Sequence, residues 1–176
     1  MQSNEKGSDL IQSILTMGMG EFELLKKAVK TDTTLFNQLF QNVLSGDRRL
    51  AWRSCWILDC ASEDFPDLLE GKIPHIIAAL LVTKDSSLKR HFTRILCRYT
   101  IPEEYQGAII DRCFGLMVPV EPAAVRVNAM QLLFNISQQI PDLKGELKLV
   151  IEALLEEGGS AGFVNRCGKL LRQLRS

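Results

Sequence analysis

This 176-residue chain has few histidines, no cluster of cysteines and no excess of positive or negative charge. Each of these features narrows the possible functions. There are two histidines, His75 and His91, and five scattered cysteines with no CxxC pair. Because a metal site needs tighter clustering of ligands than this, we expect no metal and no other cofactor. We interpret the cysteines as free thiols that pack like small hydrophobic side chains.

Long apolar runs are also missing, and none approaches the roughly 20 residues that a membrane span needs. The first seven residues are polar, and no apolar signal core follows them. We therefore predict a cytoplasmic protein without a membrane partner. The length and the 46% hydrophobic content fit one domain over residues 8–176, after a disordered N-terminus at 1–7.

The chain has no HExxH motif and no P-loop, and its one match to the GxSxG pattern of hydrolases is the stretch 158–162. The glycine-rich stretch 158–162 has no lysine and follows no predicted strand, so it is expected to be a turn between helices. His91 is equivalent to Arg53, Asn128 and Arg166 in the repeat described below, which suggests a ladder of polar residues between helices. These observations predict that the protein is not an enzyme.

The chain does contain a short motif, apolar-Pro-acid, that occurs three times. The prolines of successive copies are 36 and 39 residues apart. The copies are Phe65-Pro66-Asp67, Ile101-Pro102-Glu103 and Ile140-Pro141-Asp142. Proline suits the first turn of a helix, and a helical apolar pattern follows each copy. The first helices of the repeats are predicted over 65–83, 102–118 and 141–157, with a kink or break near Gly71 and Pro74.

A second helix follows in each repeat, and its apolar residues recur at offsets 0, 4, 7, 8 and 11 from Leu50, Leu88, Val125 and Phe163. These offsets form one stripe of an α-helix, so second helices are predicted over 47–61, 86–99, 122–138 and 160–174. Asp47, Asp85 and Ser160 are expected to cap three of them. A leading helix at 33–44 completes the first pair, and helices at 9–17 and 21–29 form an N-terminal cap.

The repeat of about 38 residues resembles the HEAT/armadillo family over residues 33–174. Proline lies early in the first helix, and the segments Leu50-Ala51-Trp52-Arg53 and Ala124-Val125-Arg126 resemble the family's apolar-x-Arg opening of the second helix. The resemblance implies an all-α protein, a right-handed α-solenoid of about four helix pairs plus the cap over 8–32. The repeats are expected at 33–62, 63–100, 101–138 and 139–176, and second helices line the concave face in such arrays.

Charge is sorted between the two kinds of helix although the net charge is zero. The segments 47–62, 86–100, 121–138 and 160–176 hold 12 of the 21 basic residues. Their only acids are Asp47, Asp59 and Glu121. Together with the family resemblance, this sorting implies a basic concave wall and an acidic outer wall.

Offsets 2, 6 and 9 of each second helix point away from the apolar stripe, at about 200°, 240° and 180° on a helical wheel. They select Trp52, Trp56 and Asp59 in the first repeat, and Arg90 and Arg94 in the second. Tryptophan and arginine are typical of interaction hot spots. The predicted binding residues are Trp52, Trp56, Arg53, Arg90, Arg94, Arg98, Gln131, Lys169 and Arg172. The alternative is that the N-terminal helices cover the two tryptophans.

We interpret this surface as a non-catalytic scaffold face that binds an acidic peptide or protein. A nucleic-acid backbone is the alternative partner, and a local basic stripe can suffice for it. A further alternative rests on some alkylpurine DNA glycosylases, which are HEAT-like arrays with tryptophans, an Asp and basic residues on the concave surface. In that interpretation Asp59 stabilises the developing sugar cation or orients water.

Overall fold

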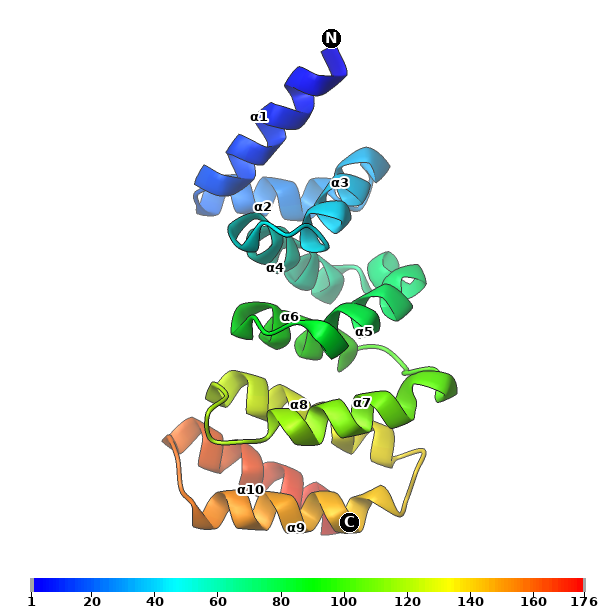
Figure 1. The fold of residues 1–176 in the computed structure, drawn as a ribbon, viewed down its shortest axis with the longest axis vertical. Coiled ribbons are helices and arrows are strands. Elements are labelled where there is room, and N and C mark those ends of the chain that lie inside the picture. The colour runs from blue at the N-terminus through cyan, green and yellow to red at the C-terminus, as the bar shows by residue number, and fades with distance from the viewer. Residues whose placement is uncertain (1, 176) are drawn as a thin grey trace. The chain divides into compact units, whose positions relative to one another are not determined.

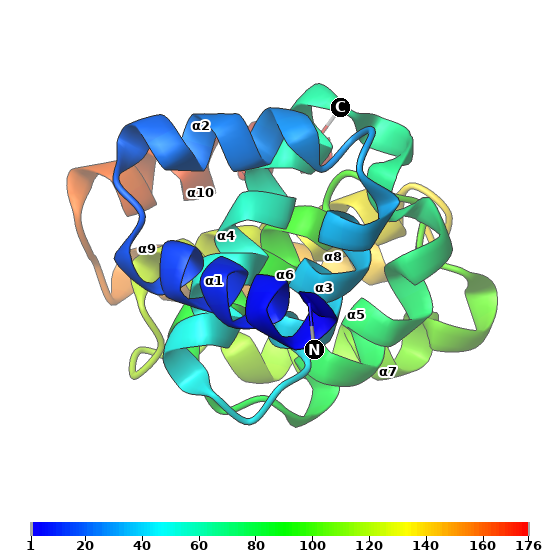
Figure 2. The same cartoon turned by 90° about the horizontal axis from the view of Figure 1, so that it is seen from above.

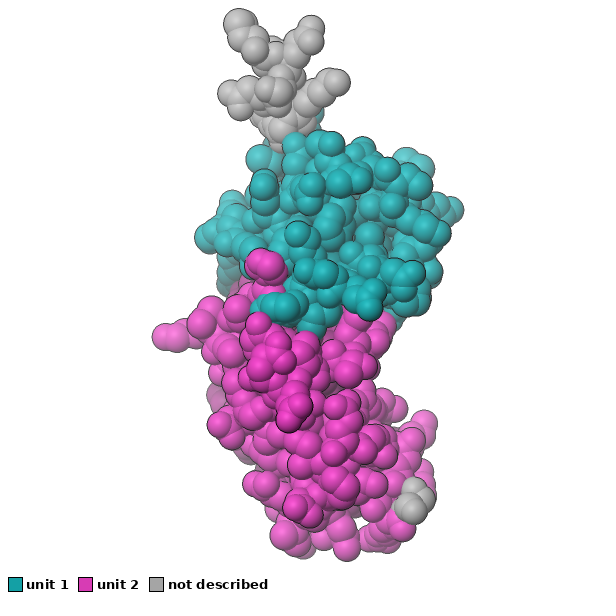
Figure 3. All heavy atoms as spheres, turned by 90° about the vertical axis from the view of Figure 1, so that its right-hand side faces the viewer, with its two compact units in different colours: residues 1–74 teal, residues 75–176 magenta. Residues whose placement is uncertain are grey.

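A computed structural model describes the backbone of residues 2–175 and the side chains of residues 9–175. The segment 1–7, predicted to be disordered, lies outside the residues described with their side chains. The chain divides into two compact units, residues 1–74 (unit 1) and 75–176 (unit 2), coloured separately in Figure 3. The boundary falls in the first turn of a helix, so each unit is described by itself below.

Unit 1 is built around one central helix, α4, against which α1, α2, α3 and η1 pack. Figure 2 shows α1 and α2 on the near side of α4. The elements are α1 (Gln2–Thr16), α2 (Met19–Ala28), α3 (Thr33–Val43), α4 (Arg48–Asp64) and the 3-10 helix η1 (Pro66–Lys72).

Unit 2 consists of helix pairs in two layers. Helices α6, α8 and α10 contact one another in sequence, with α7 packed on α8 and with α9 packed on both α8 and α10. In Figure 1, α7 and α9 lie in front of α8 and α10. The elements are α5 (Ile73–Val82), α6 (Ser86–Leu96), α7 (Glu103–Leu116), α8 (Ala123–Ser137), α9 (Leu143–Glu156) and α10 (Ala161–Arg175).

All regular elements of residues 2–175 are helices, which confirms the all-α class. The apolar stripe of the four second helices is confirmed as their core-facing side. Of its twenty positions, all are buried except Leu88, Tyr99 and Leu174, which are half-buried. The break predicted in the first helix of the second repeat is also present, because η1 ends at Lys72 and α5 begins beside Pro74.

The predicted caps occupy the starts of three second helices. The Asp47 side chain accepts a hydrogen bond from the backbone N–H of Leu50 at 2.9 Å, and Asp85 accepts from Ser87 at 2.8 Å and from Leu88 at 3.1 Å. The contact from the Phe163 N–H to the Ser160 hydroxyl is longer, 3.4 Å. Such bonds satisfy backbone donors that have no partner inside the helix.

The glycine-rich stretch before α10 is a turn between helices, as predicted. Gly158 and Gly159 have positive φ angles of 81° and 155°, which side chains rarely permit. A Cβ atom at Gly159 would lie 2.9 Å from the ring of Phe163, so the chain must be glycine there to pass this side chain.

Within the described part of the chain, no helix is long and apolar enough to cross a membrane.

Candidate binding surface

The two tryptophans of α4 form a short aromatic stack with a residue of the N-terminal cap. The rings of Trp56 and Phe22 are 4.1 Å apart and inclined by 19°, and the Trp52 ring lies 6.3 Å from that of Trp56. Phe22 comes from α2 and is buried, whereas both tryptophans are half-buried. The cap therefore covers Trp56 in part, which was the alternative to an open tryptophan surface.

Arg53, one of the predicted binding residues, anchors the first helix of unit 1 to α4. Its Nη1 donates to the carbonyl oxygens of Ile14 at 2.9 Å and Met17 at 3.3 Å. The neighbouring Arg49 donates from Nη2 to the carbonyl of Leu15 at 3.0 Å. The last carbonyls of a helix have no partner within it, so the two arginines cap the C-terminal end of α1.

Asp59 is buried, with 0% of its surface exposed, so the prediction that it is a surface acid is wrong. The helical wheel assumed solvent on the side of α4 opposite the apolar stripe. In the structure α4 is the central helix of unit 1, contacted by α1, α2, α3 and η1. Burial, and secondarily the nearby Asp59 charge, raises the pKa of the Cys55 thiol. A glycosylase carboxylate must reach its substrate, and Asp59 does not meet that condition.

The second helices of unit 2 are joined by a ladder of side-chain amides. Asn128 and Asn135 of α8 donate to the backbone carbonyls of Arg90 and Cys97, at 3.1 and 2.9 Å. From α10, Arg166 donates to Gln131 at 2.5 Å. The predicted polar ladder is confirmed at Arg53, Asn128 and Arg166, each of which reaches back to an earlier helix. These bonds fix α6, α8 and α10 as one layer.

This layer carries charge of a single sign. The helices α6, α8 and α10 contain no acid and eight basic residues, whereas α7 and α9 contain six acids. The basic residues are Lys89, Arg90, Arg94, Arg126, Arg166, Lys169, Arg172 and Arg175. Within unit 2, the sorting of charge expected from the sequence therefore corresponds to two structural layers.

Two of these basic residues have internal partners that the sequence analysis missed. Lys89 forms an ion pair with Glu121 in which the two side chains are 10% and 12% exposed. Arg126 is buried, lies 4.2 Å from the centroid of the Phe163 ring and approaches Glu157 at 4.0 Å. Lys89 and Arg126 both lie at offset 1 of their helices, about 76° from the centre of the apolar stripe. Their position at the edge of the stripe is the signal in the sequence that could have indicated partly buried charges.

The predicted binding residues of unit 2 reach solvent to different extents. Arg90, Lys169 and Arg172 are exposed, while Arg94, Arg98 and Gln131 are half-buried. Arg175 is exposed and lies 3.6 Å from Glu152 of α9. The tryptophans belong to unit 1 and the Arg90–Arg94 pair to unit 2, so the predicted surface that combines them stays a prediction.

Metal-ligating groups do not gather anywhere among the described residues. All five cysteines are free thiols, as expected from their spacing.

The geometry defines a protein of stacked helix pairs with one charged layer of second helices. The HEAT repeat domain family matches residues 12–173, so the chain belongs to the HEAT repeat family. HEAT repeats typically mediate protein interactions. No curated protein and no solved structure matches the chain.

Proposed function

We propose that this protein is a non-catalytic binding module that holds an acidic peptide or protein on the layer formed by α6, α8 and α10. The observation that carries the proposal is the absence of any acid from these three helices, which contact one another and contain eight basic residues. A surface of one sign attracts partners of the other sign and repels those of the same sign.

Arg90, Lys169 and Arg172 are the residues proposed to meet the partner first, because they are exposed. Arginine also suits this task chemically, since its planar guanidinium binds a carboxylate with two parallel hydrogen bonds. Lys89 and Arg126 are excluded from the contact surface because their side chains are engaged inside unit 2. Arg94, Arg98 and Gln131 contribute through the parts of their side chains that remain accessible.

The charge of the rest of the chain favours an acidic protein over a nucleic acid as the partner. The net charge is zero, and 18 of the 21 acids lie outside the four basic segments. These acids would repel the phosphate backbone of a nucleic acid along its length, whereas a short acidic peptide can bind to the basic layer alone. Binding to duplex DNA that falls steeply with salt, with no binding of acidic proteins, would contradict the proposal.

The test is a quantitative affinity purification with matched charge variants. The wild-type protein is compared with Arg90→Glu/Arg94→Glu and Lys169→Glu/Arg172→Glu, each of which changes the charge by about four units. The control is Lys27→Glu/Lys84→Glu, with the same charge change at two exposed lysines outside the layer.

We expect the control to retain the acidic partners of the wild type and both layer variants to lose them. The captured proteins are then purified and titrated singly against the four forms. Identical partners and affinities for all four forms would show that the layer is not the binding surface.

A further inference from the structure

The basic layer of unit 2 has an apolar middle. Offsets 2 and 9 of α8 are Val127 and Phe134, nearly opposite the apolar stripe that faces the core. Both side chains are half-buried, and the seven positions between them correspond to about 10 Å along the helix. The only charged residue of α8, Arg126, is buried against Phe163. The middle helix of the layer therefore presents apolar surface where its neighbours present charge.

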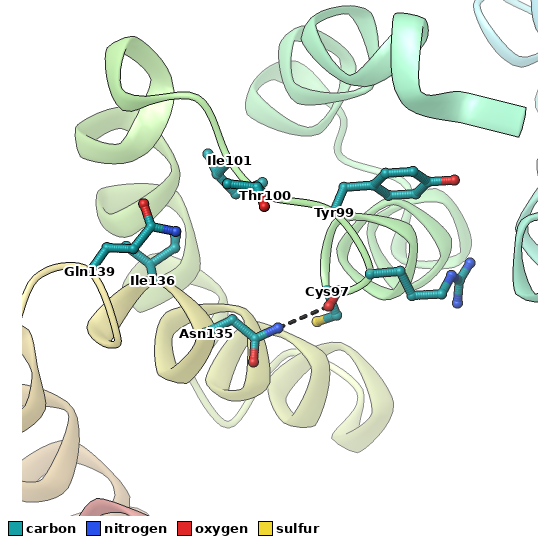
Figure 4. A pocket seen from close by; sticks show the side chains of 8 residues that line it. Cys97, Tyr99, Thr100, Ile101, Asn135, Ile136 and Gln139 are labelled. Atoms are coloured by element: carbon teal, nitrogen blue, oxygen red, sulfur yellow. Dashed lines mark hydrogen bonds between the residues drawn. The ribbon is translucent and has the colours of Figure 1, made fainter. Parts of the chain in front are cut away.

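Two hydrogen bonds fix the position of α6 beside this surface. Asn128 of α8 donates to the carbonyl of Arg90 at 3.1 Å, and Asn135 donates to the carbonyl of Cys97 at 2.9 Å (Figure 4). The residue numbers of the two pairs increase together, so α6 and α8 run in the same direction. Arg90 consequently lies beside the end of α8 that carries Val127.

Contacts with α10 fix the position of the other neighbour of α8. The Arg126 guanidinium lies 4.2 Å from the centroid of the Phe163 ring, and the Cys167 thiol lies 3.7 Å from the sulfur of Met130. These pairs also increase together, so α10 runs in the same direction as α8. The second half of α10 therefore lies beside the second half of α8.

Exposed basic side chains flank the apolar surface on both sides. Arg90 lies on the α6 side, and Lys169 and Arg172 lie on the α10 side, toward the end of α8 that carries Phe134. All three are exposed, and none of their side chains forms an ion pair or a hydrogen bond with another residue of unit 2 that the structure describes. The unit thus leaves these three charges without an internal counter-charge.

The width of this surface selects a helix as the bound segment. Packed helices have axes about 8–10 Å apart, so α6 and α10 lie roughly 16–20 Å from each other across α8. An α-helix with its side chains is about 10–12 Å wide, and one laid along α8 can meet the long basic side chains of both neighbours. A single extended strand is narrower, since strands pack about 4.8 Å apart in a sheet, and it can meet the charges of one side only.

We infer that the basic layer binds an amphipathic acidic α-helix. The apolar stripe of this helix packs on Val127 and Phe134, and acids on both of its flanks pair with the exposed basic residues of α6 and α10. The inference rests on the proposed function and deepens it, because it names the conformation of the acidic partner and the apolar stripe that this partner carries. Recognition by charge alone would need neither.

The probes are three fluorescein-labelled peptides of about 18 residues, because isolated helices shorter than about 12–15 residues are marginal in water. The first has leucines at i, i+3, i+4 and i+7 with glutamates on both flanks. The second has the same composition in scrambled order, and the third is the first with a proline in the middle of its polar face. Fluorescence polarisation should show that the first peptide binds at least tenfold more tightly than the other two.

The same titrations separate this inference from the proposed function. Equal binding of all three peptides, lost in Lys169→Glu/Arg172→Glu, would overturn the helical mode and leave the acidic partner of the layer in place. Equal binding of the first and third peptides alone would also overturn it, since proline disrupts a helix. No binding of any peptide up to about 1 mM would overturn both proposals.

Phe134→Ala tests the location of the apolar contact without changing the charge of the layer. We expect this variant to bind the first peptide at least fivefold more weakly than wild type and the scrambled peptide equally. The control is Phe114→Ala, which truncates a half-buried phenylalanine of α7 and should bind both peptides as wild type does. Thermal unfolding checks that the variants are folded, and Val127→Ala provides a smaller truncation of the same surface. Equal affinities of the α7 and α8 variants for the first peptide would overturn the site.

Neutral substitutions test the two charged flanks. Arg90→Gln on one side and Lys169→Gln/Arg172→Gln on the other should each weaken binding of the first peptide at least threefold. The control, Lys84→Gln, changes an exposed lysine outside the layer and should leave the affinity unchanged. A loss in only one of the two flank variants would contradict a helix that lies along α8 and contacts both sides.

Discussion

Equivalent positions on α4 of unit 1 and α10 of unit 2 have different environments. Offsets 2, 6 and 9 are Trp52, Trp56 and Asp59 in α4, where the first two are half-buried and the third is buried. In α10 the same offsets are Asn165, Lys169 and Arg172, and all three are exposed. The repeat thus determines which side of a second helix faces the core, and the neighbouring helices determine whether the other side is open.

The difference follows from the N-terminal cap. Helices α1 and α2 both pack on α4, and α2 places Phe22 against Trp56. The aromatic residues of α4 accordingly serve the attachment of the cap, while Lys169 and Arg172 of α10 are exposed.

Removing the aromatic contact should destabilise unit 1 most. Phe22→Ala leaves a buried space against Trp56, and substitutions of this kind cost about 3–5 kcal/mol. Denaturant unfolding followed by tryptophan emission reports on α4 directly, since the chain's two tryptophans are both in this helix. The control, Leu24→Ala, changes an α2 residue that is 70% exposed and should alter stability by less than about 0.5 kcal/mol.

Arg53 of α4 and Arg172 of α10 should differ in their contribution to the free energy of unfolding. Arg53→Ala removes the donor to the carbonyls of Ile14 and Met17, and a hydrogen bond from a charged group contributes about 1.5–3 kcal/mol. Arg172→Ala, at an exposed position of α10, should change the free energy of unfolding by less than about 0.5 kcal/mol. Equal losses for the two variants, measured by urea unfolding, would contradict the contrast between α4 and α10.

Capping should matter similarly in both units. Asp47→Ala in unit 1 and Asp85→Ala in unit 2 each remove a side-chain acceptor from a helix start, at a cost of about 1 kcal/mol. Ser160→Ala should cost less because its contact to Phe163 is 3.4 Å long. Thermal unfolding of the three variants measures this order, and a larger loss for Ser160→Ala would reverse it.

The smallest expected effect concerns Lys26 of the cap. Hydrogen bonds to Asp64 and Glu23 raise the pKa of Lys26 above 10.5. The contribution of the charged amine to stability is therefore complete below that pH and is lost as the pH rises through the raised pKa. Lys26→Met should be slightly less stable than wild type at neutral pH and should approach it at alkaline pH, as shown by unfolding midpoints. A pH-independent difference would exclude the ion pair as its cause.

Most of the fold could be predicted from the sequence because its signals are local. The apolar offsets, the acids before helix starts and the break around Pro74 depend on residues within one or two turns of each other. The described helices end within a few residues of the predicted bounds, apart from α1, whose predicted start lay further along the chain.

The candidate site could be predicted only in part because its features join distant residues. The contact of Phe22 with Trp56 and the pair Lys89–Glu121 each connect segments more than 30 residues apart. The wheel located Asp59 correctly on the side away from the apolar stripe but contained no information about what covers that side. The wheel also placed Lys169 and Arg172 on this side of α10, and both are exposed.

The most direct test compares the solvent accessibility of a tryptophan at offset 6 of α4 with that of a tryptophan at offset 6 of α10. Acrylamide quenching is measured for the native protein, with Trp52 and Trp56, and for Lys169→Trp in a Trp52→Phe/Trp56→Phe background. The account predicts weak quenching and blue-shifted emission for the native tryptophans, and strong quenching with red-shifted emission for Lys169→Trp. Equal quenching in the two proteins would contradict the claim that this side is covered in α4 and open in α10.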